Sequence, residues 1–424
     1  MKSTRVMERV SDRGRLHQAW QAVYRNAGAA GIDRMSVHTF AAQAEAYLDL
    51  IHAKLCAGTY RFRPVRRVEI PKPGSNQTRK LGIPVVMDRI VSYSLHLALA
   101  DLYEGVFTAS NFGFRRGKSQ QQAVGHLRQA VVEGYDWAVS IDLQSFFDEI
   151  PHGLILRLLR RRIADERVIT LIARALKAGI QVDGRIEKTT KGSPQGSPVS
   201  PMLSNIVLNE LDQELERRGH RYVRWADDFV ILLRSERAAR RVMDSVTDFL
   251  EQTLGLPVNG EKSQVAPVKD VEFLGFQILG GKIRIGTQAR QRFKDRVRVM
   301  TRRNNGVPMA CIIANLNEYL RGWVAYFRIQ EFRKIFNELD GFIRNRLRSM
   351  QLRKWKNPAK FQRMMIRAGR PVEQAKRTWI RMDKWRSVAR RPVRFLLNLS
   401  WFRRRGLLFL DTFTQRNLKL PFAR

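Results

Sequence analysis

Three aspartates stand out because each lies in an otherwise apolar segment. Asp227 and Asp228 are adjacent within residues 222–232 (YVRWADDFVIL), and Asp142 ends the apolar part of WAVSIDLQSFFDEI. An apolar run is typical of a buried strand. An ionised carboxylate is costly to bury, more so beside a second negative charge. Two interpretations stay open: a cation holds the carboxylates, or the segment is a loop.

Carboxylates in these positions could support chemistry on phosphate groups. Mg²⁺ takes oxygen ligands, often one or two carboxylates completed by substrate phosphates and water. Two such ions, about 3.5–4 Å apart, can activate an attacking hydroxyl and stabilise the leaving oxygen. The structural alternative treats Asp142 as a turn residue, but one of two neighbours on a strand, Asp227 or Asp228, must point inward.

The charge of the chain points to a polyanionic partner. Its 424 residues include 77 Lys+Arg and 39 Asp+Glu, a net charge of +38, while 44% are hydrophobic, as in a globular protein. Nucleic acid or an anionic membrane surface could supply the opposite charge. No apolar run of about 18 residues and no signal peptide is apparent. Cys56 and Cys311 form neither a disulfide framework nor a zinc motif. We therefore expect a soluble cytoplasmic nucleic-acid-binding protein without a membrane partner.

The elements that must position the aspartates alternate between strands and helices. Residues 1–60 have helical composition, and residues 66–84 predict two short strands around a loop that carries Lys72 and Arg79. A strand is expected over the apolar part of 137–150, another over 222–232, and helices over 151–163 and 197–219. This pattern indicates an α/β or α+β domain over about residues 60–286. From Thr287 onward basic and aromatic residues interleave in helical patterns, with a softer boundary near 365–370.

The ordered motifs resemble those of a known family. IDLQSFFDEI, GSPQGSPVSPMLSNIVL, WADD and VEFLGF resemble, in order, the palm motifs of reverse transcriptases. GIDRMSV, NFGFRRGKS, LPVNGEKSQV and LRGWVAYF extend the resemblance to group II intron reverse transcriptase/maturases, particularly the bacterial, endonuclease-less, group IIC-like class. The resemblance covers about residues 24–410.

The resemblance implies an α+β right-hand polymerase: fingers and a palm with an antiparallel sheet, then an α-helical thumb/maturase domain and a small basic C-terminal DNA-binding region. The implied division is an N-terminal extension with the start of the fingers at 1–60, fingers and palm at 61–286, thumb/maturase at 287–368, and a basic nucleic-acid-binding region at 369–424.

The same resemblance implies roles for individual residues. Asp142, Asp227 and Asp228, with the Leu143 carbonyl, would bind two Mg²⁺ ions, for which Mn²⁺ is a possible substitute. Lys72 and Arg79 would contact the dNTP triphosphate, Gln195 would lie against the nucleotide, and Phe146 or Phe147, with Phe146 favoured, would be the steric gate against a ribose 2′-hydroxyl. Arg115, Trp225, Lys262 and Gly275 would contact template or primer. Taken without the family, the rings could be core residues and Lys262 an ordinary surface lysine.

The implied function is an RNA-directed DNA polymerase that also binds its intron RNA and assists splicing and mobility. Its implied partners are an RNA template, group II intron RNA, a DNA primer or target, and dNTPs; monomer and homodimer both stay open. Two alternatives are an RNA-binding splicing factor with a vestigial polymerase site and a free-standing polymerase recruited for defence or repair. Four positions depart from the family pattern. They are Arg34 for Gly, Arg116 for Pro, Ser197 for Gly and Trp225 for Tyr. Arg34 puts the geometry of its loop in question, and Trp225 could alter primer contacts and fidelity.

Overall fold

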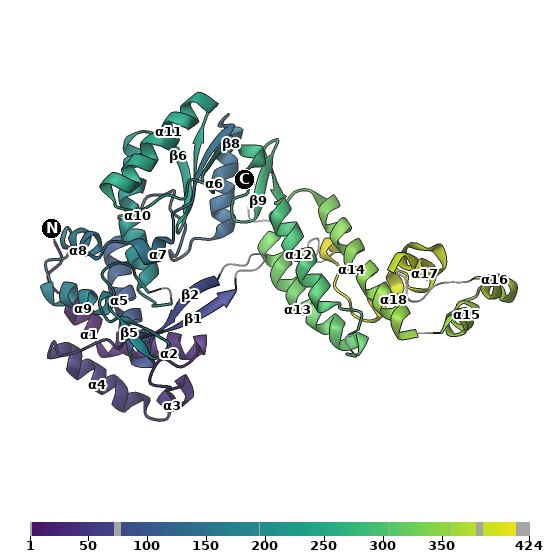
Figure 1. Ribbon diagram of the computed structural model, residues 1–424, viewed down its shortest axis with the longest axis horizontal. Coiled ribbons are helices and arrows are strands. Elements are labelled where there is room, and N and C mark those ends of the chain that lie inside the picture. The colour runs from purple at the N-terminus through teal and green to yellow at the C-terminus, as the bar shows by residue number, and fades with distance from the viewer. Residues whose placement is uncertain are drawn as a thin grey trace. The chain divides into compact units, whose positions relative to one another are not determined.

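The chain forms two compact units, Met1–Val271 and Glu272–Arg424 (Figure 1). The computed structural model describes residues 2–71, 78–194, 196–304, 306–355, 357–378 and 385–412. The division between the units falls before the expected boundary at 286, because strands β9 and β10 belong with the helices that follow them. The Ile283 amide donates to Glu331 Oε2 at 2.7 Å, and the Glu331 amide donates to the Ile283 carbonyl at 2.8 Å. The family-based division at 60, 286 and 368 stays a prediction.

The central sheet of the first unit is antiparallel throughout its described strands, in the order β6-β7-β3-β8. The strands are β3 (Trp137–Ile141), β6 (Arg221–Trp225), β7 (Asp228–Leu233) and β8 (Gln264–Pro267). Helices α6 (Gln120–Val132), α10 (Ser200–Arg217) and α11 (Glu236–Asp248) pack on this sheet, and β7 is buried along its length after Asp228. This arrangement agrees with the expected palm.

A second sheet of the first unit has the order β2-β1-β4-β5. Its strands are β1 (Val65–Pro71), β2 (Thr78–Ile83), β4 (Ile180–Val182) and β5 (Arg185–Glu187). β1 and β2 are antiparallel, and β1 and β4 are parallel. The predicted pair of strands around residues 66–84 is therefore confirmed. Residues 72–77, which connect them and include Lys72, lie outside the described residues.

Helices supply most of the remaining core of the first unit. They are α1 (Val6–Ser11), α2 (Arg13–Asn26), α3 (Val37–Ala41), α4 (Ala44–Cys56), α5 (Val86–Tyr103), α7 (Phe146–Glu149), α8 (His152–Arg160) and α9 (Glu166–Leu176), with a π-helical turn at Phe249–Thr253 and a 3₁₀ turn at Val268–Asp270. α5 is buried along most of its length and contacts α1, α2, α4 and α10. It is therefore the helix around which the N-terminal helices pack.

The interpretation of residues 222–232 as one strand was wrong. The segment is a hairpin in which Trp225, the last residue of β6, pairs with Asp228, the first of β7, and Ala226 and Asp227 form the turn. Ala226 has a φ of +58°, a left-handed conformation that a two-residue hairpin turn requires but that alanine rarely adopts. Period-two reasoning missed the turn because no Gly, Asn or Pro marks it.

The second unit is a short hairpin followed by helices. Its elements are β9 (Phe276–Leu279), β10 (Lys282–Ile285), α12 (Thr287–Met300), α13 (Met309–Phe327), α14 (Arg333–Trp355), α15 (Pro358–Arg367), α16 (Val372–Arg377), a 3₁₀ turn at Trp385–Ala389, α17 (Arg391–Leu396) and α18 (Leu399–Arg404). Phe293, Trp323 and Phe327 form a run of ring contacts in its core, with centroids 4.4 and 4.6 Å apart. The expected basic, aromatic-bearing helices are thus present. Within the described residues, no helix combines the length and apolar character needed to cross a bilayer.

Candidate active site

The central sheet brings Asp142 and Asp228 to neighbouring strand ends. Ile141 at the end of β3 pairs with Phe229 in β7. In an antiparallel pair the next residues outward, Asp142 and Asp228, are then neighbours across the ladder. Asp227 precedes Asp228 in the turn, so all three predicted carboxylates belong to one edge of the sheet.

The electrostatics of these carboxylates reflect that proximity. Burial raises the pKa of Asp228 to about 7, and the charges of Asp227 and Asp142 act in the same direction. Burial also raises the pKa of Asp227, with Asp142 adding to the shift and Arg224 and Arg79 opposing it. Asp228 is nevertheless exposed to solvent. A carboxylate that has a raised pKa and is still accessible suits a site that receives a charged ligand.

The Asp142 carboxylate already faces a cation of the protein. Lys262 Nζ lies 3.6 Å from Asp142 Oδ2, and both side chains are about half exposed. The segment that carries Lys262 is held to the end of β3, because the Asn259 amide donates to the Asp142 carbonyl at 2.8 Å and the Gln144 amide to the Pro257 carbonyl at 2.9 Å. Neither hydrogen bond uses the Leu143 carbonyl. That carbonyl therefore keeps the acceptor capacity that the predicted metal ligand needs.

The chemistry of this donor set fits a hard divalent cation. Among the described hydrogen bonds and ion pairs, none ends on the Asp228 carboxylate, and Asp142 is the one carboxylate of the three with a described ion pair, to Lys262. Oxygen-only ligands of this kind suit Mg²⁺ or Mn²⁺. The side chains as described are not gathered to ligand distance: within the part of the chain that the structure covers, no three His, Cys, Asp or Glu groups are close enough together to hold a metal ion.

Comparison with known proteins decides the family. Residues 70–278 match the family described as reverse transcriptase (RNA-dependent DNA polymerase), and residues 290–368 match the group II intron, maturase-specific domain. The chain is 30% identical to protein YkfC of Escherichia coli over 295 residues, which are 60% of this chain and 77% of that protein. It belongs to the group II intron reverse transcriptase/maturase family.

Two further relatives agree with this assignment. Group II intron-encoded protein LtrA of Lactococcus lactis subsp. cremoris is 28% identical over 61% of this chain and 54% of its own length. The putative COX1/OXI3 intron 2 protein of Saccharomyces cerevisiae is 28% identical over 55% of this chain and 34% of its own. The chain thus spans about half of LtrA and a third of the yeast protein. Reverse transcriptases use divalent metal ions, and the two domains together imply binding of RNA, including intron RNA, and DNA.

The described part of the reverse transcriptase brings one predicted triphosphate contact toward the aspartates. Arg79 lies on β2 rather than in the expected loop, is exposed, and is close enough to Asp227 to lower the pKa of that carboxyl. Lys72, its predicted companion, and Gln195 lie outside the described residues. Their roles stay predictions.

The two candidate gate rings differ in burial. Phe146 is 3% exposed and belongs to the core, whereas Phe147 is partly exposed and packs against that core, with the ring centroids 5.4 Å apart. The preference for Phe146 as the gate stays a prediction, and the greater exposure of Phe147 is an argument for the second ring.

The loop around Gln195 is tied both to Phe147 and to the second sheet. The Ser193 amide donates to the Phe147 carbonyl at 2.7 Å. A Cβ on Gly196 would lie 2.3 Å from the Gly82 carbonyl oxygen, so this position, with a φ of +116°, requires glycine. The loop thus contacts both Phe147 and strand β2, which carries Arg79. The departure at Ser197 leaves this arrangement in place.

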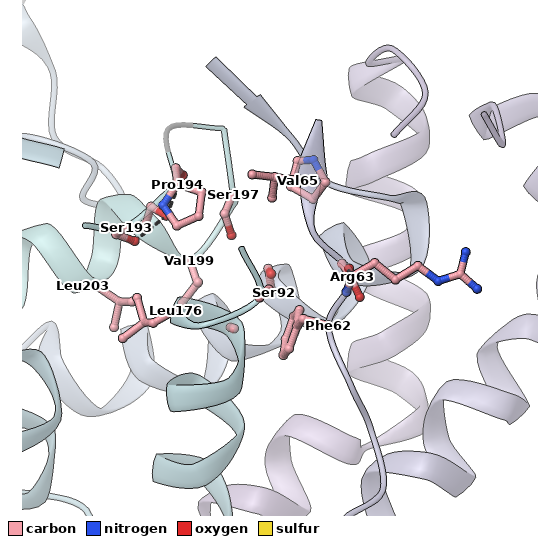
Figure 2. A pocket seen from close by; sticks show the side chains of 15 residues that line it. Phe62, Arg63, Val65, Ser92, Leu176, Ser193, Pro194, Ser197, Val199 and Leu203 are labelled. Carbon is pink, nitrogen blue, oxygen red and sulfur yellow. Dashed lines mark hydrogen bonds between the residues drawn. The ribbon is translucent and has the colours of Figure 1, made fainter. Parts of the chain in front are cut away.

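A small pocket lies behind that loop, as Figure 2 shows, with Ser193, Pro194 and Ser197 across from Val65 and above Phe62. Its cavity volume is about 20 Å³, which is room for one water molecule and far too little for a nucleotide. The pocket therefore backs the loop and is not the nucleotide site.

The prediction that Arg115 contacts template or primer does not agree with its position. Its side chain is 8% exposed and pairs with Glu104 at 2.8 Å. Its Nη1 donates to the carbonyls of Thr108 and Asn111 at 2.6 and 2.9 Å. Arg115 therefore stabilises the loop that contains it, through contacts within the protein. The neighbouring Phe114 was missed by sequence reasoning: it is 45% exposed and has a φ of +55°, unusual for a bulky residue.

The remaining predicted contacts are distributed over both units. Trp225 ends β6 beside the aspartate turn and is partly exposed. Gly275 belongs to the second unit, where its φ is +80° and a Cβ would come 3.3 Å from the Phe327 ring. Packing within that unit already accounts for glycine there. Arg34, the departure that put its loop geometry in question, adopts a φ of +59°, so arginine keeps the left-handed conformation suited to glycine.

Proposed function

We propose that this reverse transcriptase extends a DNA primer along an RNA template by nucleotidyl transfer at Asp142, Asp227 and Asp228. The primer 3′-hydroxyl forms a bond to the α-phosphorus of a dNTP, and the bond to pyrophosphate breaks. The observation that carries the proposal is the meeting of three carboxylates at one sheet edge in a chain of this family. We further propose that the protein acts on its own intron RNA as a maturase.

The three carboxylates, with the Leu143 carbonyl, are proposed to hold two Mg²⁺ ions, and Mn²⁺ can replace them. When bound, such ions neutralise the phosphates and lower the pKa of the attacking hydroxyl. Arg79 and Lys72 would compensate the triphosphate charge from the β1–β2 hairpin, as cations do in other phosphoryl-transfer sites. Phe147 would contact the sugar, and Gln195 the nucleotide base pair.

We propose that each unit, taken by itself, carries contacts for nucleic acid. Beside the aspartates, exposed Phe114 and partly exposed Trp225 offer rings on which a base can stack, and Lys262 offers a cation to the backbone. In the second unit, exposed arginines on α12 and α13 are suited to the phosphates of structured RNA. The C-terminal residues from 369 onward are proposed to add a further basic surface for intron RNA or DNA.

Primer extension on an RNA template tests the polymerase proposal. Asp227→Asn keeps the shape of the side chain and removes its charge, so we expect extension to fall about 1,000-fold or more. Asp244→Asn on the exposed face of α11 is the matched control and should leave extension unchanged. Full activity of Asp227→Asn would overturn the mechanism. Intron splicing by the wild-type protein without any extension would favour the splicing-factor alternative.

A further inference from the structure

A charged arginine lies completely buried one residue before Trp225. Arg224 and its partner Asp212 on α10 both have side chains with 0% exposure. Arg224 Nε donates to Asp212 Oδ1 at 2.8 Å, and Nη2 donates to Asp212 Oδ2, a two-pronged pairing. A buried ion pair is often no more stabilising than apolar residues of similar volume. Stability alone therefore does not explain why this ion pair is buried here.

The remaining guanidinium nitrogen of Arg224, Nη1, contacts the turn formed by Ala226 and Asp227. Arg224 Nη1 donates to the Ala226 carbonyl at 2.9 Å and to Asn205 Oδ1 at 2.9 Å. Ala226 is the turn residue with a φ of +58°, directly before Asp227. A non-glycine residue holds such a conformation only when its surroundings impose it. The guanidinium supplies a fixed donor for the carbonyl of that strained residue.

Asn205 extends the contact to a second segment. Its Nδ2 donates to the Gly113 carbonyl at 2.8 Å, and its side chain is 0% exposed. Gly113 lies directly against the turn, because a Cβ there would be 2.2 Å from the Ala226 nitrogen. The Arg224 amide donates to the Ser110 carbonyl, and the Phe112 amide to the Arg224 carbonyl, each at 2.9 Å. The loop before Phe114 and the turn are therefore fixed to each other.

We propose that Arg224, Asp212 and Asn205 are positioning residues that hold the Ala226–Asp227 turn in the geometry in which Asp227 and Asp228 receive the metal ions. The three residues touch no reacting group; they act through the Ala226 carbonyl and the Gly113 backbone. The kinetic part of this inference rests on the proposed polymerase function, whereas the conformational part does not. The two parts can therefore be measured separately.

Amide hydrogen exchange tests the conformational part. Arg224→Lys can still pair with Asp212 but lacks the fork that reaches Ala226, and Asn205→Ala releases Gly113. We expect the amides of 226–228 and 113–114 to exchange at least tenfold faster in both variants. Asp165→Asn is the matched control: this buried carboxylate accepts from the Met7 amide at 2.9 Å, and none of its described hydrogen bonds or ion pairs involves the turn. Unchanged exchange at the turn in a folded Asn205→Ala protein would overturn the proposal, as would equal acceleration in Asp165→Asn.

Metal dependence of primer extension tests the kinetic part. In Arg224→Lys and Asn205→Ala we expect the Mg²⁺ concentration for half-maximal extension to rise about tenfold and kcat to fall, with the Kd for primer–template unchanged. A purely structural role would instead lower the amount of active protein and leave the metal midpoint as in wild type, and that result would overturn the proposal. If wild type extends no primer, the proposed function fails, while the exchange result still decides whether these residues hold the turn.

Discussion

At the scale of single residues, burial separates two side chains that the sequence presents as equivalents. Phe146 and Phe147 are neighbours at the start of the short helix α7. The sequence alone does not predict which of the two rings points into the core, because that depends on how helix α7 is oriented after strand β3. The fold assigns Phe146 to the core and leaves Phe147 accessible. Burial also bears on Arg115, for which the family resemblance implied a contact with template or primer but whose described contacts are internal.

The assignment of Phe147 as the gate predicts a change in sugar selectivity. Phe147→Val opens space where a ribose 2′-hydroxyl would lie, so we expect ribonucleotide incorporation relative to deoxyribonucleotide to rise at least tenfold, an energy difference of about 1.4 kcal/mol. Competing rNTP and dNTP in primer extension measure this ratio.

Phe146→Val is the control for that experiment. Removing part of a core ring should lower the free energy of unfolding by about 1–3 kcal/mol and lower the Tm with it. It should have little effect on sugar selectivity. If Phe146→Val relaxes selectivity and Phe147→Val does not, the burial-based assignment is wrong and Phe146 is the gate.

At the scale of elements, the sequence predicted most of what positions the site. The strand pair around 66–84, helix α10 behind its prolines and the strand before Asp142 were all expected from pattern and turn residues. The hairpin at 222–232 was not, because its turn is made by Ala226 and Asp227 rather than by glycine. Long-range contacts supply the missing information: Arg224, Asn205 and Gly113 impose a conformation that local sequence does not favour. An arginine inside an apolar strand was the one signal that such contacts existed.

Helix α5 and the segment before β1 share a buried carboxyl that predicts pH-dependent stability. Asp88 is 2% exposed, and its carboxylate accepts from the Tyr60 hydroxyl at 2.7 Å and the Arg63 amide at 2.9 Å. Burial nevertheless raises the pKa of Asp88 from its ordinary 3.8 to about 6. The folded state therefore binds a proton that the unfolded state has already released between about pH 4 and 6.

The sign of the effect follows from that difference. Stability attributable to Asp88 is greatest below about pH 4 and falls as pH rises toward 6, with a slope of at most about 1.4 kcal/mol per pH unit. Asp88→Asn cannot ionise, so the wild-type minus variant difference in free energy of unfolding should decline across that window and level off above it. Denaturant titrations at several pH values measure the difference. A constant difference from pH 4 to 7 would show that Asp88 does not titrate in this range.

At the scale of the whole molecule, 77 Lys and Arg residues outnumber 39 Asp and Glu residues, so about half of the basic side chains cannot be paired one-to-one with an acidic group. Many arginines of the first unit are paired with acidic groups, as Arg217 is with Glu214 at 2.7 Å. Arg296 on α12 and Arg321 on α13 are exposed on helices of the second unit, and no ion pair of theirs is among the described ones. Charge of this second kind is available to phosphates, which is why composition could predict a nucleic-acid partner, and Arg296 and Arg321 are our proposed contacts.

This distinction predicts how RNA binding responds to salt. For each RNA phosphate that the protein no longer neutralises, the negative slope of log K against log salt concentration should become shallower by about 0.7–0.9. The double variant Arg296→Gln/Arg321→Gln should therefore bind a structured RNA more weakly at low salt and show a slope shallower by about 1.4–1.8, measured by filter binding over a range of KCl. Arg217→Gln removes the same type of charge from an existing ion pair and should leave the slope nearly unchanged. An equal change in slope for Arg217→Gln would mean that net charge alone, rather than these two arginines of the second unit, governs the binding of RNA.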